Sequence, residues 1–118
     1  MYLMCDDLKV AKLVKENNEP FMELLVWYEH FEEIPLGLFC VEGDPFTLVK
    51  RIPYERFNNW LCKRCFPRNR IDCKDVLKTL GLKEYNPVRI TYITQGVLTC
   101  FDMFWVDFED GRGKPKTF

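Results

Sequence analysis

The chain of 118 residues has the length of one domain, and its apolar fraction of 47% is high enough to bury a core. Ten Phe and three Trp exclude the composition of a disordered chain. The longest apolar runs, such as residues 24–28, are far too short to cross a bilayer. Because the first residues lack a basic region followed by an apolar one, we expect a cytoplasmic protein.

Charge is divided unevenly along a chain whose formal net charge is -1. Residues 1–50 hold four basic and ten acidic side chains, a balance of -6, whereas residues 51–118 hold thirteen and eight, a balance of +5. Neither half alone would bury enough surface to be stable, so we expect a single domain over residues 1–118. The basic excess predicts a surface that meets an acidic partner.

The first 52 residues predict a mainly β region that is acidic. Strands are expected at residues 2–5, 9–15 and 21–28, with turns at residues 6–7 and 17–20. The most strongly predicted strand is 21–28, because it is rich in aromatic and branched residues. A turn at residues 43–45 and a short strand within residues 46–52 follow.

Residues 53–96 predict a basic unit of three short helices. The first runs from Pro53 to residue 65 and ends at the turn made by Phe66 and Pro67. The second is capped by Asn69 or Asp72 and stops at Gly81. Its expected inward face is Ile71, Val76, Leu77 and Leu80.

The third helix begins at Asn86 and Pro87, as a cap and a first-turn proline, and ends at Gly96. Residues 97–110 predict a loop and a closing strand, and residues 111–118 predict a frayed tail. The chain is therefore predicted to be α+β: a small N-terminal antiparallel β-meander packed against three short helices, with a closing C-terminal strand.

Candidate catalytic and metal-binding groups are scarce. Cys62 and Cys65 form a single CxxC pair and His30 is the sole His, whereas a structural zinc site needs four ligands. Ser is absent, and no Gly-rich phosphate loop is present. We therefore expect reduced thiols, no metal, no cofactor and no enzymatic activity.

The best candidate binding surface is basic and surrounds the Phe66–Pro67 break. Its side chains are Lys63, Arg64, Arg68 and Arg70, and Arg forks suit carboxylates and phosphates. The competing interpretation is structural: Arg64 and Arg70 would pair internally, with Asp72, Asp75 or the acidic N-terminal half. Three aromatic side chains are further candidates for partner contacts: Phe101, Phe104 and Trp105.

The order of these motifs resembles the small N-terminal subdomain of HipA-type toxin kinases. The segments IPLGLF, CFP, RNR, LGL, YNP and TQG carry the resemblance, which spans roughly residues 1–105. The matching positions are Pro35, Leu36, Phe57, Phe66, Pro67, Arg70, Leu80, Gly81, Pro87 and Gly96. Stand-alone versions are HipS-like antitoxins of toxin–antitoxin modules or companion proteins, so the resemblance implies a non-catalytic protein that binds and restrains a HipA-like Ser/Thr kinase.

Two other functions stay open at this point. The first is a phage or mobile-element inhibitor of a host defence nuclease, with Glu29, Glu32, Glu33, Glu42 and Asp44 as a phosphate mimic. The second is direct binding of nucleic acid by the basic segment, which the overall pI of about 5.9 disfavours.

Overall fold

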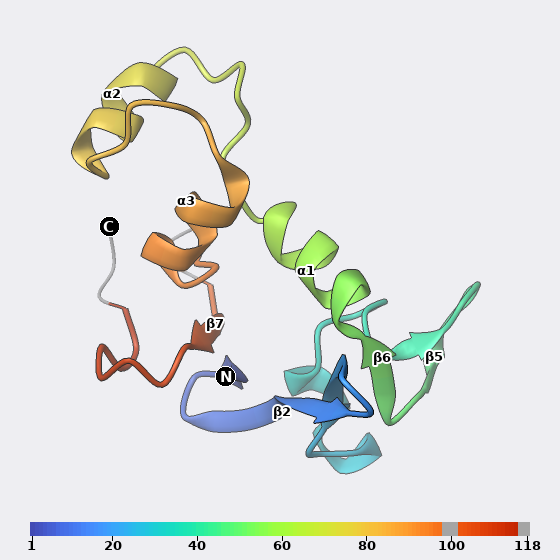
Figure 1. The fold of residues 1–118 in the computed structure, drawn as a ribbon. Helices are drawn as coiled ribbons and strands as arrows, with labels where there is room; N and C mark the ends of the chain where they lie inside the picture. The colour runs from blue at the N-terminus through green and yellow to red at the C-terminus, as the bar shows by residue number, and fades with distance from the viewer. Residues whose placement is uncertain (98–101, 116–118) are drawn as a thin grey trace.

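The computed structural model describes residues 1–97 and 102–115. The fold is α+β, as predicted, with a closing C-terminal strand in the main sheet (Figure 1). In chain order the elements are β1 (Tyr2–Cys5), β2 (Leu8–Glu16), β3 (Glu19–Leu24), the 3₁₀ helix η1 (Tyr28–Glu33), β4 (Cys40–Val41), β5 (Asp44–Leu48), β6 (Arg51–Pro53), α1 (Tyr54–Cys62), α2 (Cys73–Thr79), α3 (Pro87–Thr94) and β7 (Phe104–Asp107).

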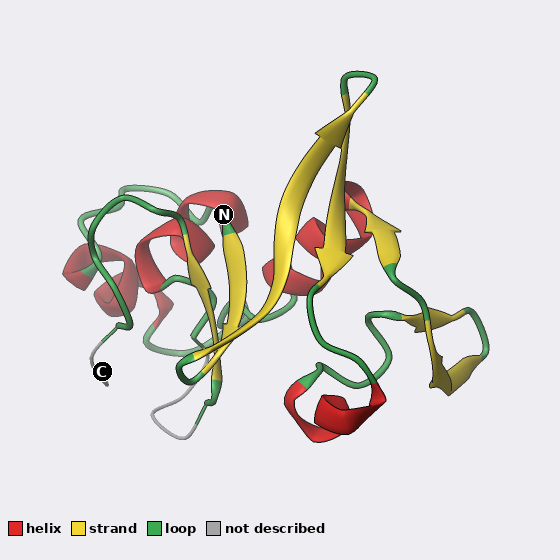
Figure 2. Cartoon of the chain, turned by 90° about the horizontal axis from the view of Figure 1, so that it is seen from below, coloured by secondary structure: helices red, strands yellow, loops and turns green. Residues whose placement is uncertain are grey.

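The main sheet has the antiparallel order β6-β3-β2-β1-β7, and β4 and β5 form a separate hairpin. Asn17 and Asn18 both take positive φ, 53° and 66°, which lets a two-residue turn join β2 to β3 at the tip of a long hairpin (Figure 2). β7 pairs with β1, so that Val106 lies opposite Leu3. The sheet therefore joins the two ends of the chain.

The expected strand at residues 21–28 is wrong beyond Leu24. There the chain leaves the sheet, and residues from Tyr28 form η1 instead. The reason is tertiary: the Tyr28 hydroxyl accepts a hydrogen bond from the backbone N–H of Leu48 at 3.0 Å, which ties η1 to β5. Two strands replace the single strand expected within residues 46–52. β5 pairs with β4 in the hairpin, whereas β6 pairs with β3 in the main sheet.

α1 covers the sheet with the buried side chains of Phe57 and Leu61. It ends three residues before the predicted position, at Cys62, because the N–H groups of Arg64 and Cys65 bond to carbonyls only three residues earlier. α3 begins as predicted: the Asn86 side chain accepts hydrogen bonds from the N–H groups of Val88 and Arg89.

α2 lies at one end of the molecule and buries Leu77 alone (Figure 1). Asp72 precedes the helix as predicted, but its side chain makes no capping hydrogen bond. The expected inward face is wrong at Ile71, which is fully exposed. Ile71 lies one residue before the cap and outside the helix, so the helical spacing that placed it inward does not apply there.

One apolar cluster forms the core, and it includes residues from both charge halves, from Leu3 to Val106. Its largest fully buried side chains are Phe39, Phe57, Leu3, Met22 and Ile52. Within the described part of the chain, no helix has both the length and the hydropathy needed to cross a membrane.

Candidate partner-binding site

A hollow with a volume of about 600 Å³ lies between the end of α1, the Phe66–Pro67 turn, α2 and α3. We call it the α2–α3 groove. Its apolar lining is Phe66, Pro67, Val76, Leu80, Ile90 and Val97, and its polar lining includes Arg64, Arg70, Asp72, Asp75, Thr79 and Thr94.

The helical repeat of α2 decides which of its side chains face the groove. Asp75, Val76 and Thr79 recur at spacings of one, three and four residues and line the groove together. Lys74 and Lys78 are four residues apart on the other side of the helix, and both are exposed. α2 therefore turns its basic residues away from the groove, and the groove is apolar with charges of both signs.

The Phe66–Pro67 turn is held in place by Tyr85. The Tyr85 hydroxyl donates a hydrogen bond to the Phe66 carbonyl oxygen at 2.6 Å, and the two rings meet edge to face with centroids 5.6 Å apart. Desolvation raises the pKa of the Tyr85 phenol, so the hydroxyl stays protonated and can donate. Arg68 lies over the same ring, with its guanidinium carbon 5.0 Å from the centroid.

Arg64 is a structural residue that joins α1 to α3 and to the segment before β7. Its side chain is only 16% exposed and forms an ion pair with Asp102, which is 7% exposed. Nε donates to the Gly96 carbonyl oxygen at 2.9 Å, and the guanidinium lies 4.8 Å from the centre of the Trp60 ring. Nη2 is buried against Asp102 and forms no other hydrogen bond among the described residues. Burial lowers the pKa of the guanidinium by desolvation.

The other basic candidates stay at the surface around the turn. Lys63 follows the last residue of α1 and is exposed, as is Arg68. Arg70 is also exposed but is paired with Asp72. The internal pairing expected as the alternative therefore applies to Arg64 and Arg70, although the partner of Arg64 is Asp102.

The two aromatic candidates within the described residues, Phe104 and Trp105, do not form a surface cluster. Trp105 is 5% exposed, and its indole N–H donates to the Asp6 carbonyl oxygen at 2.8 Å. A contact role for Trp105 is thus corrected, since pairing with β1 turns this ring into the protein. Phe104 is partly buried against Trp60, with ring centroids 6.3 Å apart. Phe101 lies outside the described residues.

The apolar residue at the rim of the groove was missed from the sequence. Ile71 lies between two lining residues, Arg70 and Asp72, and its side chain is fully exposed. The signal was present as an isoleucine inside a polar turn, but helical spacing favoured an inward position. An exposed Ile beside an apolar hollow is typical of a protein-contact surface.

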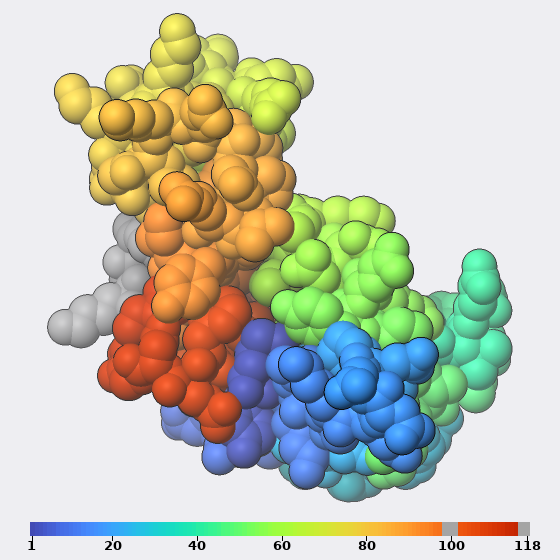
Figure 3. All heavy atoms as spheres, in the orientation of Figure 1, coloured from blue at the N-terminus to red at the C-terminus, as the bar shows by residue number. Residues whose placement is uncertain are grey.

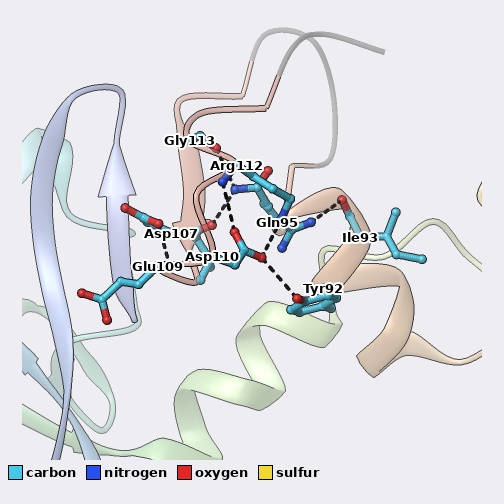
Figure 4. Close-up of polar contacts among 9 residues, drawn as sticks. Tyr92, Ile93, Gln95, Asp107, Glu109, Asp110, Arg112 and Gly113 are labelled. Carbon is cyan, nitrogen blue, oxygen red and sulfur yellow. Dashed lines mark hydrogen bonds and ion pairs between the residues drawn. The ribbon is translucent and has the colours of Figure 1, made fainter.

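The wall formed by α3 is fastened by the C-terminal segment (Figure 4). The buried Gln95 amide donates to the carbonyl oxygens of Val106 and Gly113 at 3.2 and 2.9 Å. Arg112 donates to Asp110 and to the Ile93 carbonyl oxygen, at 2.8 and 3.3 Å. Within the tail expected to fray over residues 111–118, Arg112 and Gly113 thus form long-range hydrogen bonds to the rest of the protein.

Burial favours the protonated form of the two thiols in the CxxC pair. Desolvation raises the pKa of both Cys62 and Cys65, which favours the thiol over the nucleophilic thiolate. His30 lies on η1, far in sequence from Cys62 and Cys65, and its Nδ1 is 3.8 Å from a Glu33 carboxylate oxygen. In residues 1–97 and 102–115, no three His, Cys, Asp or Glu side chains gather so as to hold a metal ion. What the groove residues offer is apolar contact and hydrogen bonding.

Comparison with known proteins gives no relative: no family model, no curated protein and no solved structure matches the chain.

Proposed function

We propose that this protein is a non-catalytic regulatory subunit that binds another protein through the α2–α3 groove. One observation carries the proposal: a hollow of about 600 Å³ with an apolar lining opens at the surface beside a fully exposed isoleucine, Ile71. Apolar side chains of a partner would be desolvated there, which is the arrangement that dominates binding energy at protein interfaces. The exposed cation Arg68, which directly follows the Phe66–Pro67 turn, would contact acidic groups of the partner.

A HipA-like Ser/Thr kinase is the partner to test first. Four of the positions that carry the resemblance to the HipA N-terminal subdomain line the groove: Phe66, Pro67, Arg70 and Leu80. We infer that the protein acts in the cytoplasm as an antitoxin-like or companion subunit that restrains the kinase. The kinase would carry the catalytic activity, and binding of this chain would inhibit it.

The test is a tagged pull-down from the native cell, followed by titration calorimetry with the kinase it retains. Ile71→Asp places a charge against the apolar contact, and we expect affinity to fall at least about tenfold. Val88→Asp is the matched control, because Val88 is 58% exposed on α3 and does not line the groove. Equal affinity of Ile71→Asp and the unaltered protein would contradict the proposal, provided both melt at the same temperature.

The second candidate, an inhibitor of a defence nuclease, is favoured by one observation. The acids Glu29, Glu32 and Glu33 lie on η1, and Glu42 and Asp44 lie on the β4–β5 hairpin to which η1 is bonded. A nuclease in the pull-down, displaced by an excess of duplex DNA, would favour this function over kinase restraint.

A further inference from the structure

A row of aromatic rings joins η1 to the β4–β5 hairpin. The Tyr28 and Phe31 rings are stacked with centroids 6.4 Å apart, and Phe31 and Phe46 are stacked at 6.3 Å. Trp27 meets Tyr28 edge to face at 5.1 Å. The row is fixed to the hairpin by the Tyr28–Leu48 hydrogen bond. It ends at Phe46, whose side chain is 68% exposed.

The two ends of this row differ in their contacts with cations. At one end, the Lys50 ammonium lies 4.3 Å from the centre of the Trp27 ring. Elsewhere in the main sheet, Lys9 lies over the Tyr2 ring at 4.3 Å and Arg51 over the Phe21 ring at 5.4 Å. Among the described residues no cation lies over Phe46.

Two acidic residues lie on the same hairpin as Phe46. Glu42 and Asp44 belong to the same hairpin and are both exposed. Asp44 is engaged in the hairpin itself, since it accepts hydrogen bonds from the Thr47 hydroxyl at 2.5 Å and the Phe46 N–H at 3.2 Å. The Asp44 carboxylate is therefore held at the Phe46 backbone, whereas Glu42 forms no ion pair with any described residue.

We propose that the exposed face of Phe46 binds an arginine side chain of a basic segment in a partner protein. The planar guanidinium would stack on the ring and pair with the Glu42 carboxylate, in the negative field of Asp44. Arginine fits better than lysine, because its flat, weakly hydrated group stacks on an aromatic face and still directs N–H donors sideways to a carboxylate. Exposed Val41, 44% accessible on β4, adds an apolar contact for the stem of the side chain.

This surface is separate from the α2–α3 groove. The hairpin and α2 lie at opposite ends of the molecule and project from it there (Figure 3). The inference therefore goes beyond the proposed function, and each can fail without the other.

The test is a fluorescence anisotropy titration of the full chain with labelled nona-arginine and nona-lysine peptides. We expect nona-arginine to bind about fivefold more tightly than nona-lysine. Phe46→Leu keeps an apolar side chain but removes the aromatic face, and it should abolish that preference. Glu42→Gln should weaken nona-arginine binding about threefold, since one of its carboxylate partners is lost.

Two controls separate this site from general attraction to the acidic half. Glu19→Gln removes an exposed acid at the β2–β3 turn and should leave the preference for arginine intact. Ile71→Asp, which alters the groove, should do the same. Equal affinity for the two peptides, or an arginine preference that survives Phe46→Leu, would overturn the inference. Concentration-dependent self-association that Phe46→Leu abolishes in sedimentation velocity would also overturn it, because a second copy would then be the occupant.

Discussion

At the scale of single residues, Arg64 illustrates how one side chain connects distant parts of the chain. It bonds to Gly96 and Asp102, more than thirty residues away in sequence, and stacks on Trp60 in the preceding helix α1. Both members of the ion pair are largely buried, at 16% and 7% exposure. A buried pair of this kind is costly to break, because the remaining charge loses its counter-ion in a place that water reaches poorly.

We expect Arg64→Met to lower the free energy of unfolding by about 3 kcal/mol, since it leaves the Asp102 carboxylate buried without its cation. Urea denaturation followed by Trp fluorescence measures the change. The matched control is Arg68→Met, which removes an exposed guanidinium from the same turn and should cost less than about 1 kcal/mol. Equal losses in the two variants would show that the buried pair is not a stabilising contact.

The residues of the candidate site differ in how much of their environment the sequence could predict. Sequence spacing grouped Lys63, Arg64, Arg68 and Arg70 correctly around one turn, because they are close in the chain. Sequence spacing could not tell which of these four side chains is buried. The burial of Arg64 depends on its contact with Asp102, which is distant in sequence. The same is true of Trp105, whose burial follows from pairing with β1.

At the scale of elements, the α3 helix is defined by local signals at both ends. Asn86 caps its first turn, and Gln95 and Gly96 end it with φ values of 55° and 76°. A Cβ on Gly96 would lie 2.6 Å from Leu61 Cδ1, so glycine is required there by both backbone conformation and packing. These ends place Ile90 and Thr94 toward the groove.

We expect Asn86→Ala to destabilise the protein by about 1 kcal/mol, because the N–H groups of Val88 and Arg89 lose their acceptor. Thermal unfolding followed by circular dichroism measures the effect. Asn59→Ala is the matched control: Asn59 is exposed inside α1, where alanine favours the helix, so stability should be unchanged or slightly higher. A larger loss in Asn59→Ala than in Asn86→Ala would contradict the capping role.

Local signals were less informative for the segment from Leu24 to Leu48. Residues 25–28 have high strand propensity but lie outside the sheet, since Tyr28 is recruited to the β4–β5 hairpin. Strand propensity describes fit to a half-buried pleated surface, and it does not register a long-range hydrogen bond such as that between Tyr28 and Leu48.

At the scale of the whole molecule, the fold is closed by its two ends. β1 at the N-terminus pairs with β7 near the C-terminus, and the N-terminal ammonium lies 2.8 Å from a Glu109 carboxylate oxygen. The outer edge of β7 is covered by Gln95, whose backbone oxygen accepts from the Val106 N–H at 2.8 Å. The closing strand is thus held on both sides.

We expect a chain truncated to residues 1–103 to lose cooperative unfolding, because Trp105 and Val106 leave the core and the edge of β1 is exposed. Urea denaturation monitored by circular dichroism tests this, with Trp105→Phe as a milder comparison that keeps the strand but loses the hydrogen bond to Asp6. A sharp transition with an unchanged midpoint in the truncated chain would contradict a structural role for β7.

The sequence by itself determined the fold class, the asparagine turn between β2 and β3, the cap of α3 and the grouping of basic residues around Phe66 and Pro67. Each of these follows from the conformational preferences or the spacing of residues that are close together in the sequence. Only the tertiary structure decided that Arg64 and Trp105 are buried, that Ile71 is exposed beside a groove, and that a row of aromatic rings ends at Phe46. Those features depend on which distant segments meet, because burial and exposure follow from long-range packing.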